Sequence, residues 1–205
     1  MPAAMAPLLL ALQILLATSG QPGGAEHLLA GAQAFREGRY EAALVEFRVA
    51  QRLGAKEAAG YAAASLVKLG RAEEAVEVFA AADAAGDDAV LGYYRAIACH
   101  DARLYLCADR LLGEVGERAG PRIAEQARRT RAALAAELAR EPARASIDWY
   151  LGRCAERRAD RRPALAGAYC DEAVGLATRR GDRYHLAEAA AERAALTSPP
   201  PSGAR

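Results

Sequence analysis

Apolar residues recur at helical spacing in two short segments that meet at Gly38, within AFREGRYEAALVEFRVA at residues 34–50. The same pattern returns 32 residues later in SLVKLGRAEEAVEVFAAA, around Gly70. Glycine ends a helix at little cost because it enters the left-handed conformation that most residues avoid. Each unit is therefore predicted to be two short helices joined by a tight turn, with Gly54 and Gly86 ending the second helix of the first two units.

Matching residues lie one period apart through three such units. They are Ala43, Ala75 and Cys107; Phe47, Phe79 and Leu111; and Arg39, Arg71 and Arg103. A fixed period with two helices per unit is typical of stacked helix hairpins, in which each hairpin covers the apolar face of its neighbour. We expect an all-α array with hairpins over residues 25–55, 57–87 and 89–117.

The first unit, GAQAFREGRYEAALVEFRVAQRLG, resembles a tetratricopeptide repeat. The matching small and aromatic positions are Gly31, Gly38, Tyr40, Ala43 and Phe47 in this unit, and Ala63, Gly70, Ala75 and Phe79 in the second. The third unit keeps only Leu104, Cys107 and Leu111 of the pattern. The resemblance implies a right-handed solenoid of antiparallel hairpins. It also implies a scaffold that holds other proteins, in a complex of the bacterial cell envelope.

These positions also have a direct physical reading. Small residues at Gly31, Ala43, Ala63 and Ala75 let the two helices of a hairpin approach closely. The two rings listed above, Phe47 and Phe79, would fill the gap between one hairpin and the next. We assign structural roles to all of these residues and no chemistry.

Beyond the third unit the period fades. Pro121 and Pro142 bound a predicted packing helix over residues 118–141. Residues 146–197 are typical of a divergent hairpin followed by a capping helix, with Ser146 as an N-cap and Gly181 as a break. The tail, residues 198–205, is predicted to be disordered.

The N-terminal segment has the pattern of an export signal. The apolar run PLLLALQILLA at residues 7–17 precedes the small-residue stretch TSGQPGG. The run is shorter than the ~20 apolar residues that span a bilayer, so we expect no stable membrane span. We expect residues 1–20 to be a signal peptide and the protein to be periplasmic or secreted. The alternative is a buried N-terminal helix on a cytoplasmic adaptor.

Composition supports the helical prediction and limits the partners. Of the 205 residues, 53% are hydrophobic but only 6% aromatic, which favours helices packed through small residues. The formal net charge of +1 argues against a nucleic-acid partner, since neutralising phosphates needs a basic excess. Residues 1–117 carry −5 and residues 118–205 carry +6, an asymmetry that would also suit a self-associating structural module.

The four cysteines flank two predicted turns. Cys99 and Cys107 lie on either side of the third turn, and Cys154 and Cys170 on either side of the last. In an exported protein this arrangement suggests two disulfides, while small buried thiols are the alternative. We expect no metal site, because CHDARLYLC lacks a C-x-x-C pair and a clear fourth ligand.

A binding surface is better motivated than catalysis. The three histidines, His27, His100 and His185, fall in different helices, no catalytic motif occurs, and we expect neither enzymatic activity nor a cofactor. Two columns follow the 32-residue period: the basic Arg36, Lys68 and His100, and beside them Phe35, Val67 and Cys99. Such columns could hold an acidic or C-terminal carboxylate of an extended peptide in the concave groove. The alternative is a plain polar rim.

Overall fold

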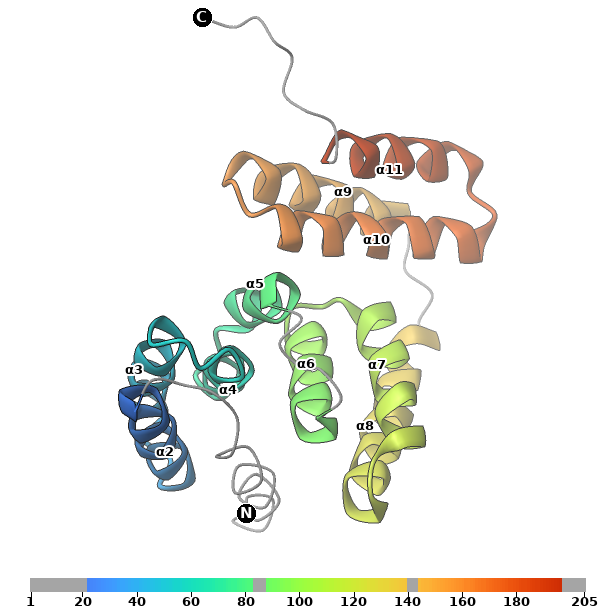
Figure 1. Ribbon diagram of the computed structural model, residues 1–205. Coiled ribbons are helices and arrows are strands. Elements are labelled where there is room, and N and C mark those ends of the chain that lie inside the picture. The colour runs from blue at the N-terminus through green and yellow to red at the C-terminus, as the bar shows by residue number, and fades with distance from the viewer. Residues whose placement is uncertain (1–21, 83–87, 140–143, 197–205) are drawn as a thin grey trace, which may run out of the picture.

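The computed structural model describes residues 22–82, 88–139 and 144–196, and this part of the chain contains helices and no strand. The all-α prediction is confirmed (Figure 1). The described helices are α2 (Pro22–Arg36), α3 (Tyr40–Arg52), α4 (Ala58–Lys68), α5 (Ala72–Ala82), α6 (Ala89–Asp101), α7 (Tyr105–Arg118), α8 (Pro121–Ala139), α9 (Arg144–Ala159), α10 (Pro163–Arg180) and α11 (Arg183–Ala195).

Consecutive helices pack in pairs. The pairs α2–α3, α4–α5, α6–α7 and α9–α10 are hairpins, α8 packs on α7, and α11 packs on α10 and α9. The last three helices form a layer across α5 and α7, to which α10 contributes the contacting face (Figure 1). Two groups of helices that are distant in sequence therefore meet along α10.

Four hairpins share one turn geometry. In each turn a backbone N–H donates to the carbonyl oxygen five residues earlier, over 2.8 to 2.9 Å. The donor and acceptor pairs are Arg39 and Ala34, Arg71 and Leu66, Leu104 and Cys99, and Arg162 and Arg157. The residue before each donor has a positive φ, and these residues are Gly38, Gly70, Arg103 and Arg161. A left-handed residue with this bond closes a helix, and the bond aligns the four hairpins residue by residue.

This alignment corrects the predicted register of the third unit. The offset from the second turn to the third is 33 residues, as the bonds Arg71 to Leu66 and Leu104 to Cys99 show. The places predicted for Cys107 and Leu111 are therefore taken by their neighbours, Ala108 and Leu112, which are almost fully buried. The prediction was wrong because two apolar residues stand side by side at each place, so either period leaves an apolar residue there.

The same shift moves an arginine into a glycine position. Arg103 has a φ of 64° and occupies the place of Gly38 and Gly70, not that of Arg39 and Arg71. A side chain in the left-handed region costs about 1 to 2 kcal/mol relative to glycine. The third turn is therefore strained where the first two are relaxed.

Within each hairpin a small residue on the first helix is matched with a position on the second. A Cβ atom placed on Gly31 would lie 2.7 Å from ring atoms of Phe47, so only glycine fits there. The equivalent positions in the other hairpins hold Ala63 and Phe79, Ala96 and Leu112, and Cys154 and Cys170, all buried. The fourth hairpin thus carries a covalent bond where the first carries a glycine and a ring, with sulfur atoms 2.11 Å apart.

The remaining repeat positions are also in the core. Nine residues after each turn acceptor stands an alanine with no exposed surface, and these alanines are Ala43, Ala75, Ala108 and Ala166. Tyr40 packs edge-on against Phe35, with 5.3 Å between ring centroids. Phe47 also reaches the next hairpin, where its ring lies 5.5 Å from that of Tyr61.

Several predicted boundaries can be compared with the structure. Pro121 is the first residue of α8, and Gly181, with a φ of 65°, ends α10 as predicted. Ser146 is not an N-cap, because α9 already begins at Arg144. Gly86, Pro142, the predicted signal peptide and the predicted disordered tail lie outside the described residues. Among the described helices, none combines the length and apolarity needed to cross a bilayer.

The contact between Gly31 and Phe47 generates a stability prediction. Gly31→Ala should lower the free energy of unfolding by about 1 to 3 kcal/mol, since the added methyl group must displace a buried ring. Urea denaturation followed by circular dichroism measures the change.

Gly152→Ala is the matched control for this substitution. Gly152 lies on the exposed side of α9, and nothing lies within 4 Å of its added Cβ atom. Alanine should raise the free energy of unfolding there by up to about 1 kcal/mol through helix propensity. Equal effects of the two substitutions would contradict the close approach of α2 and α3.

Candidate functional site

One carboxylate in α5 joins the two groups of helices. Glu73 accepts a hydrogen bond from the Tyr169 hydroxyl at 2.8 Å and one from Arg153. Its second oxygen lies 3.1 Å from Nε of Arg157 and 3.5 Å from Nη1 of Arg162. Three arginines of the C-terminal group therefore converge on a single negative charge, and we call this cluster the junction.

The junction governs the ionisation of Glu73. Burial by itself raises the pKa of this carboxyl group. Hydrogen bonds from Tyr169 and Arg153, with the charges of Arg153 and Arg157, outweigh burial and hold the pKa of Glu73 below its ordinary value. Glu73 is therefore an anion at neutral pH.

Two further carboxylates cap helices of the opposite group. The residues preceding α7 and α10, Leu104 and Arg162, offer no side-chain cap to the first-turn N–H groups. Glu77 of α5 accepts the N–H of Leu165 at 2.8 Å. Orphan donors at these helix starts are thus satisfied by acids 65 to 88 residues away in sequence.

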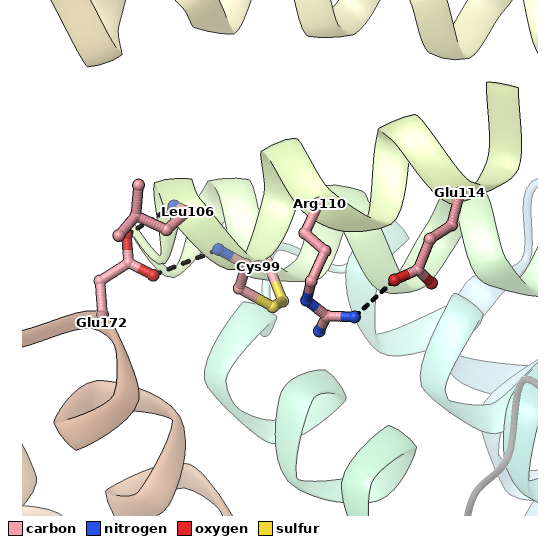
Figure 2. The surroundings of a disulfide bond; sticks show 6 residues. Cys99, Leu106, Arg110, Glu114 and Glu172 are labelled. Atoms are coloured by element: carbon pink, nitrogen blue, oxygen red, sulfur yellow. Dashed lines mark hydrogen bonds and ion pairs between the residues drawn. A yellow bond between two sulfur atoms is a disulfide. The ribbon is translucent and has the colours of Figure 1, made fainter. Parts of the chain in front are cut away.

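Glu172 of α10 caps α7 in the same way and is nearly buried. It accepts the N–H groups of Leu106 at 2.6 Å and Cys107 at 3.2 Å (Figure 2). Its exposed fraction is 3%. Burial raises the pKa of Glu172 to about 7, although the backbone N–H groups oppose this shift. Its charge consequently changes close to neutral pH.

An aromatic platform lies beside the junction. Trp149 is 39% exposed, and the guanidinium groups of Arg103 and Arg153 lie 5.9 and 5.8 Å from its ring. The Tyr150 hydroxyl donates to the carbonyl oxygen of Arg103 at 2.6 Å. A cavity of about 380 Å³ is lined by this platform and by Glu73. The strained conformation of Arg103 thus accompanies a cation–π contact.

A larger groove lies between the hairpin α6–α7 and the helices α10 and α11. Its volume is about 660 Å³, within the range of ligand sites in proteins. Its apolar walls include Val76 of α5, Leu106 of α7 and Leu196 after α11. The groove therefore has walls from both groups of helices and exists only while the junction holds them together.

Three arginines bring positive charge to the groove. Arg110 pairs with Glu114 at 2.7 Å, and Arg193 pairs with Asp171 at 2.6 Å. Arg95, which is half-buried, makes no hydrogen bond or ion pair with another residue in the described part of the chain. Arg95 is therefore the cation of the groove with the most to gain from an anionic ligand.

The groove also contains a disulfide. The structure pairs Cys99 with Cys107 and Cys154 with Cys170, the pairing across each turn that the sequence suggested, with Cα separations of 6.0 and 5.4 Å. Cys99 and Cys107 line the groove. Figure 2 shows this disulfide with Glu172 to one side and Arg110 to the other.

The basic and apolar columns predicted from the period are not assembled as expected. Phe35 and Val67 belong to the core, with exposed fractions of 2% and 8%. Arg36 and Lys68 are exposed, and the Lys68 ammonium lies 5.5 Å from the ring of Tyr94. These side chains form a polar face on α2 and α4.

The third member of the basic column is wrong. The turn register places Asp101 in line with Arg36 and Lys68, while His100 falls in line with Phe35. His100 and Asp101 bond to each other at 2.9 Å. The acidic residue therefore ends the column, because the third unit is one residue longer.

Sequence reasoning missed Arg95 and Glu172. The signal for Arg95 was a charged residue where the two preceding units have Ala30 and Ala62. Glu172 had no comparable signal, because its partners are 65 and 66 residues away. Only the packing of α10 on α7 reveals its role.

The histidines do not converge on one site. His27, His100 and His185 lie on α2, α6 and α11. His185 is buried between Asp182 at 2.7 Å and Asp148 at 2.9 Å, and the hydrogen bond from Asp182 raises its pKa despite burial. Over the described ranges, no group of three His, Cys, Asp or Glu side chains is arranged to hold a metal ion.

Comparisons of the chain with protein-family models, with curated proteins and with solved structures give no match. The resemblance to a tetratricopeptide repeat therefore rests on the residues of this chain alone and stays a prediction.

The junction predicts a large effect of a near-isosteric substitution. Glu73→Gln leaves three part-buried arginines facing one another without their anion, and should lower the free energy of unfolding by about 3 kcal/mol. Because its folded-state pKa is depressed, the contribution of Glu73 is present above the unfolded pKa and is lost as the pH falls. Urea denaturation at several pH values measures both effects.

Glu74→Gln is the control for the junction. Glu74 is the next residue of α5 but pairs with the exposed Arg71, and exposed pairs contribute at most about 1 kcal/mol. A loss as large as that of Glu73→Gln would show that α5 is sensitive to any neutralised carboxylate and would contradict the junction.

Glu172 predicts a pH dependence of the opposite sign. Its folded-state pKa of about 7 lies above the unfolded value of about 4.3, so the folded state binds the proton more tightly. The stability of the wild type relative to Glu172→Gln should therefore fall by up to about 3 kcal/mol as the pH rises from about 5 to 8. The exposed Glu188, changed to Gln, should give a flat difference over this range.

Proposed function

We propose that this protein is an exported scaffold of the tetratricopeptide type that binds an extended acidic segment of a partner protein. The observation that carries the proposal is Arg95, a half-buried cation in an apolar groove with no partner in the described part of the chain. A carboxylate that reached it would form a charge-assisted hydrogen bond in a partly desolvated setting.

The groove suits a chain segment in size and chemistry. A volume of about 660 Å³ accommodates a few side chains, and an extended segment presents alternate side chains to opposite faces. Apolar side chains of the segment would pack on Val76 and Leu106 while a neighbouring carboxylate met Arg95. The bound segment would thus be both acidic and apolar.

The repeat architecture supports this class of function. Helix hairpins with one turn geometry recur in four places, and stacked arrays of such hairpins offer long binding surfaces. A right-handed solenoid with divergent C-terminal helices is the arrangement that we propose for the chain. In this proposal the groove lies where the regular hairpins meet the divergent ones.

Export to the bacterial cell envelope is the location that we propose. Two disulfides suit an oxidising compartment, and the apolar run at residues 7–17 is the proposed signal. A cytoplasmic adaptor is the alternative if that segment is retained.

The proposal is tested with peptides selected from a displayed random library on the full-length, oxidised chain. The selected peptides should carry Asp or Glu next to apolar residues. Fluorescence anisotropy should show at least about tenfold weaker binding to Arg95→Glu, equivalent to about 1.4 kcal/mol. Arg48→Glu, at an exposed position on α3, makes the same charge change away from the groove and should leave the dissociation constant nearly unchanged.

Two outcomes would contradict this function. Selected peptides with no acidic preference would remove the role of Arg95. Equal weakening by Arg95→Glu and Arg48→Glu would show attraction to the overall charge of the protein, which is screened by salt, and no binding in the groove.

A further inference from the structure

The two disulfides differ in their access to small molecules. Cys154 and Cys170 have exposed fractions of 0% and lie inside the hairpin α9–α10. Cys99 is 3% exposed, but Cys107 is part-exposed, and both line the groove. A thiol that enters the groove therefore reaches Cys107 first and has no comparable route to the other pair.

The surroundings of Cys107 favour a thiolate. Cys107 is the third residue of α7, where the positive end of the helix dipole stabilises an anion. Arg110 lies one turn further along α7, and Arg95 lies one turn before Cys99 on α6; both line the groove. Part-exposed cysteines near cations and helix starts are the reactive ones, because the thiolate is the nucleophile.

Two acidic groups oppose this effect only in part. Glu114 neutralises some of the charge of Arg110, at 2.7 Å. Glu172 accepts the N–H of Cys107, and burial raises its pKa to about 7, so much of it is uncharged at neutral pH. Arg95 remains without a carboxylate partner among the described residues.

The turn between the two cysteines is held by other bonds. The N–H of Leu104 donates to the carbonyl oxygen of Cys99 at 2.8 Å. Tyr150 and Tyr169, from the C-terminal group, donate to the carbonyl oxygens of Arg103 and Ala102 at 2.6 and 3.3 Å. Opening the disulfide therefore leaves the hairpin α6–α7 clamped, so reduction does not require unfolding.

We propose that Cys99–Cys107 is a redox-active disulfide that exchanges with cysteine thiols of a partner segment in the groove. The proposal rests on the proposed function only for the way in which the thiol substrate is held. The substrate class is an extended polypeptide with two cysteines.

The exchange is balanced in two steps. A substrate thiolate attacks Sγ of Cys107, the bond between Cys107 and Cys99 breaks, and Cys99 leaves as a thiolate that takes up a proton. The second substrate thiolate then attacks the mixed disulfide at the substrate sulfur and releases Cys107. The substrate is oxidised to a disulfide, and the protein gains two electrons and two protons; the reverse reaction reduces a substrate disulfide.

The test exposes the oxidised full-length chain to glutathione redox buffers, traps free thiols by alkylation and measures each cysteine by peptide mass. The pair Cys99–Cys107 should open at least about tenfold faster than Cys154–Cys170, which serves as the internal control. The helical circular dichroism signal should persist. In Cys99→Ser, oxidised glutathione should form a mixed disulfide at Cys107.

Arg95→Glu separates the electrostatic argument from simple access. With dithiothreitol, a neutral reductant, this variant should open Cys99–Cys107 several-fold more slowly, because Cys99 becomes a poorer leaving group, while Arg48→Glu should match the wild type.

The proposal is overturned if both pairs open at the same rate, or if Cys99–Cys107 opens only when the helical signal is lost. It is also overturned if Cys107 forms no mixed disulfide in Cys99→Ser. These readouts use no peptide ligand. Failure of the library selection with intact exchange would therefore remove only the acidic-segment function, and the converse result would remove only the redox site.

Discussion

A single carboxylate, that of Glu73, is the constraint on which the rest of this structure depends. Arg153, Arg157 and Arg162 come from the C-terminal helices and are only partly exposed. Cations gathered in that way repel one another unless an anion lies among them, and the loss of solvent makes the requirement stronger. Glu73 meets it from the first turn of α5, where a negative charge also complements the helix dipole. The C-terminal layer is thereby tied to the hairpin array.

The groove is a consequence of that tie. Its walls belong to α5, α6 and α7 on one side and to α10 and α11 on the other, so neither group of helices contains it alone. Glu77 and Glu172 add capping bonds across the same boundary and fix how α10 lies on its neighbours. Whatever binds beside Arg95 or reacts with Cys107 thus depends on the alignment of two helix groups, and the pH response of Glu172 acts at this boundary.

Departures from the repeat are concentrated around this boundary. The first two turns use Gly38 and Gly70, whereas the turns next to the junction place Arg103 and Arg161 in the left-handed region. Each costs about 1 to 2 kcal/mol relative to glycine, and for Arg103 the strain accompanies a contact with Trp149. Strain of this kind persists where surrounding structure over-determines it, here through the Tyr150 hydroxyl. The regular hairpins supply stability, and the irregular ones supply the chemistry.

The sequence by itself determined the helices, the hairpin turns and the cysteine pairs, because each depends on residues close together in the chain: a glycine at a helix end, or two cysteines flanking a turn. It did not determine the register of the third unit, since Cys107 and Ala108 are both small and apolar, and only the backbone bond from Leu104 to Cys99 distinguishes them. The tertiary structure alone decided the junction and the groove. Glu73 and Glu172 meet partners 65 to 96 residues away, and such contacts follow no period that the sequence displays.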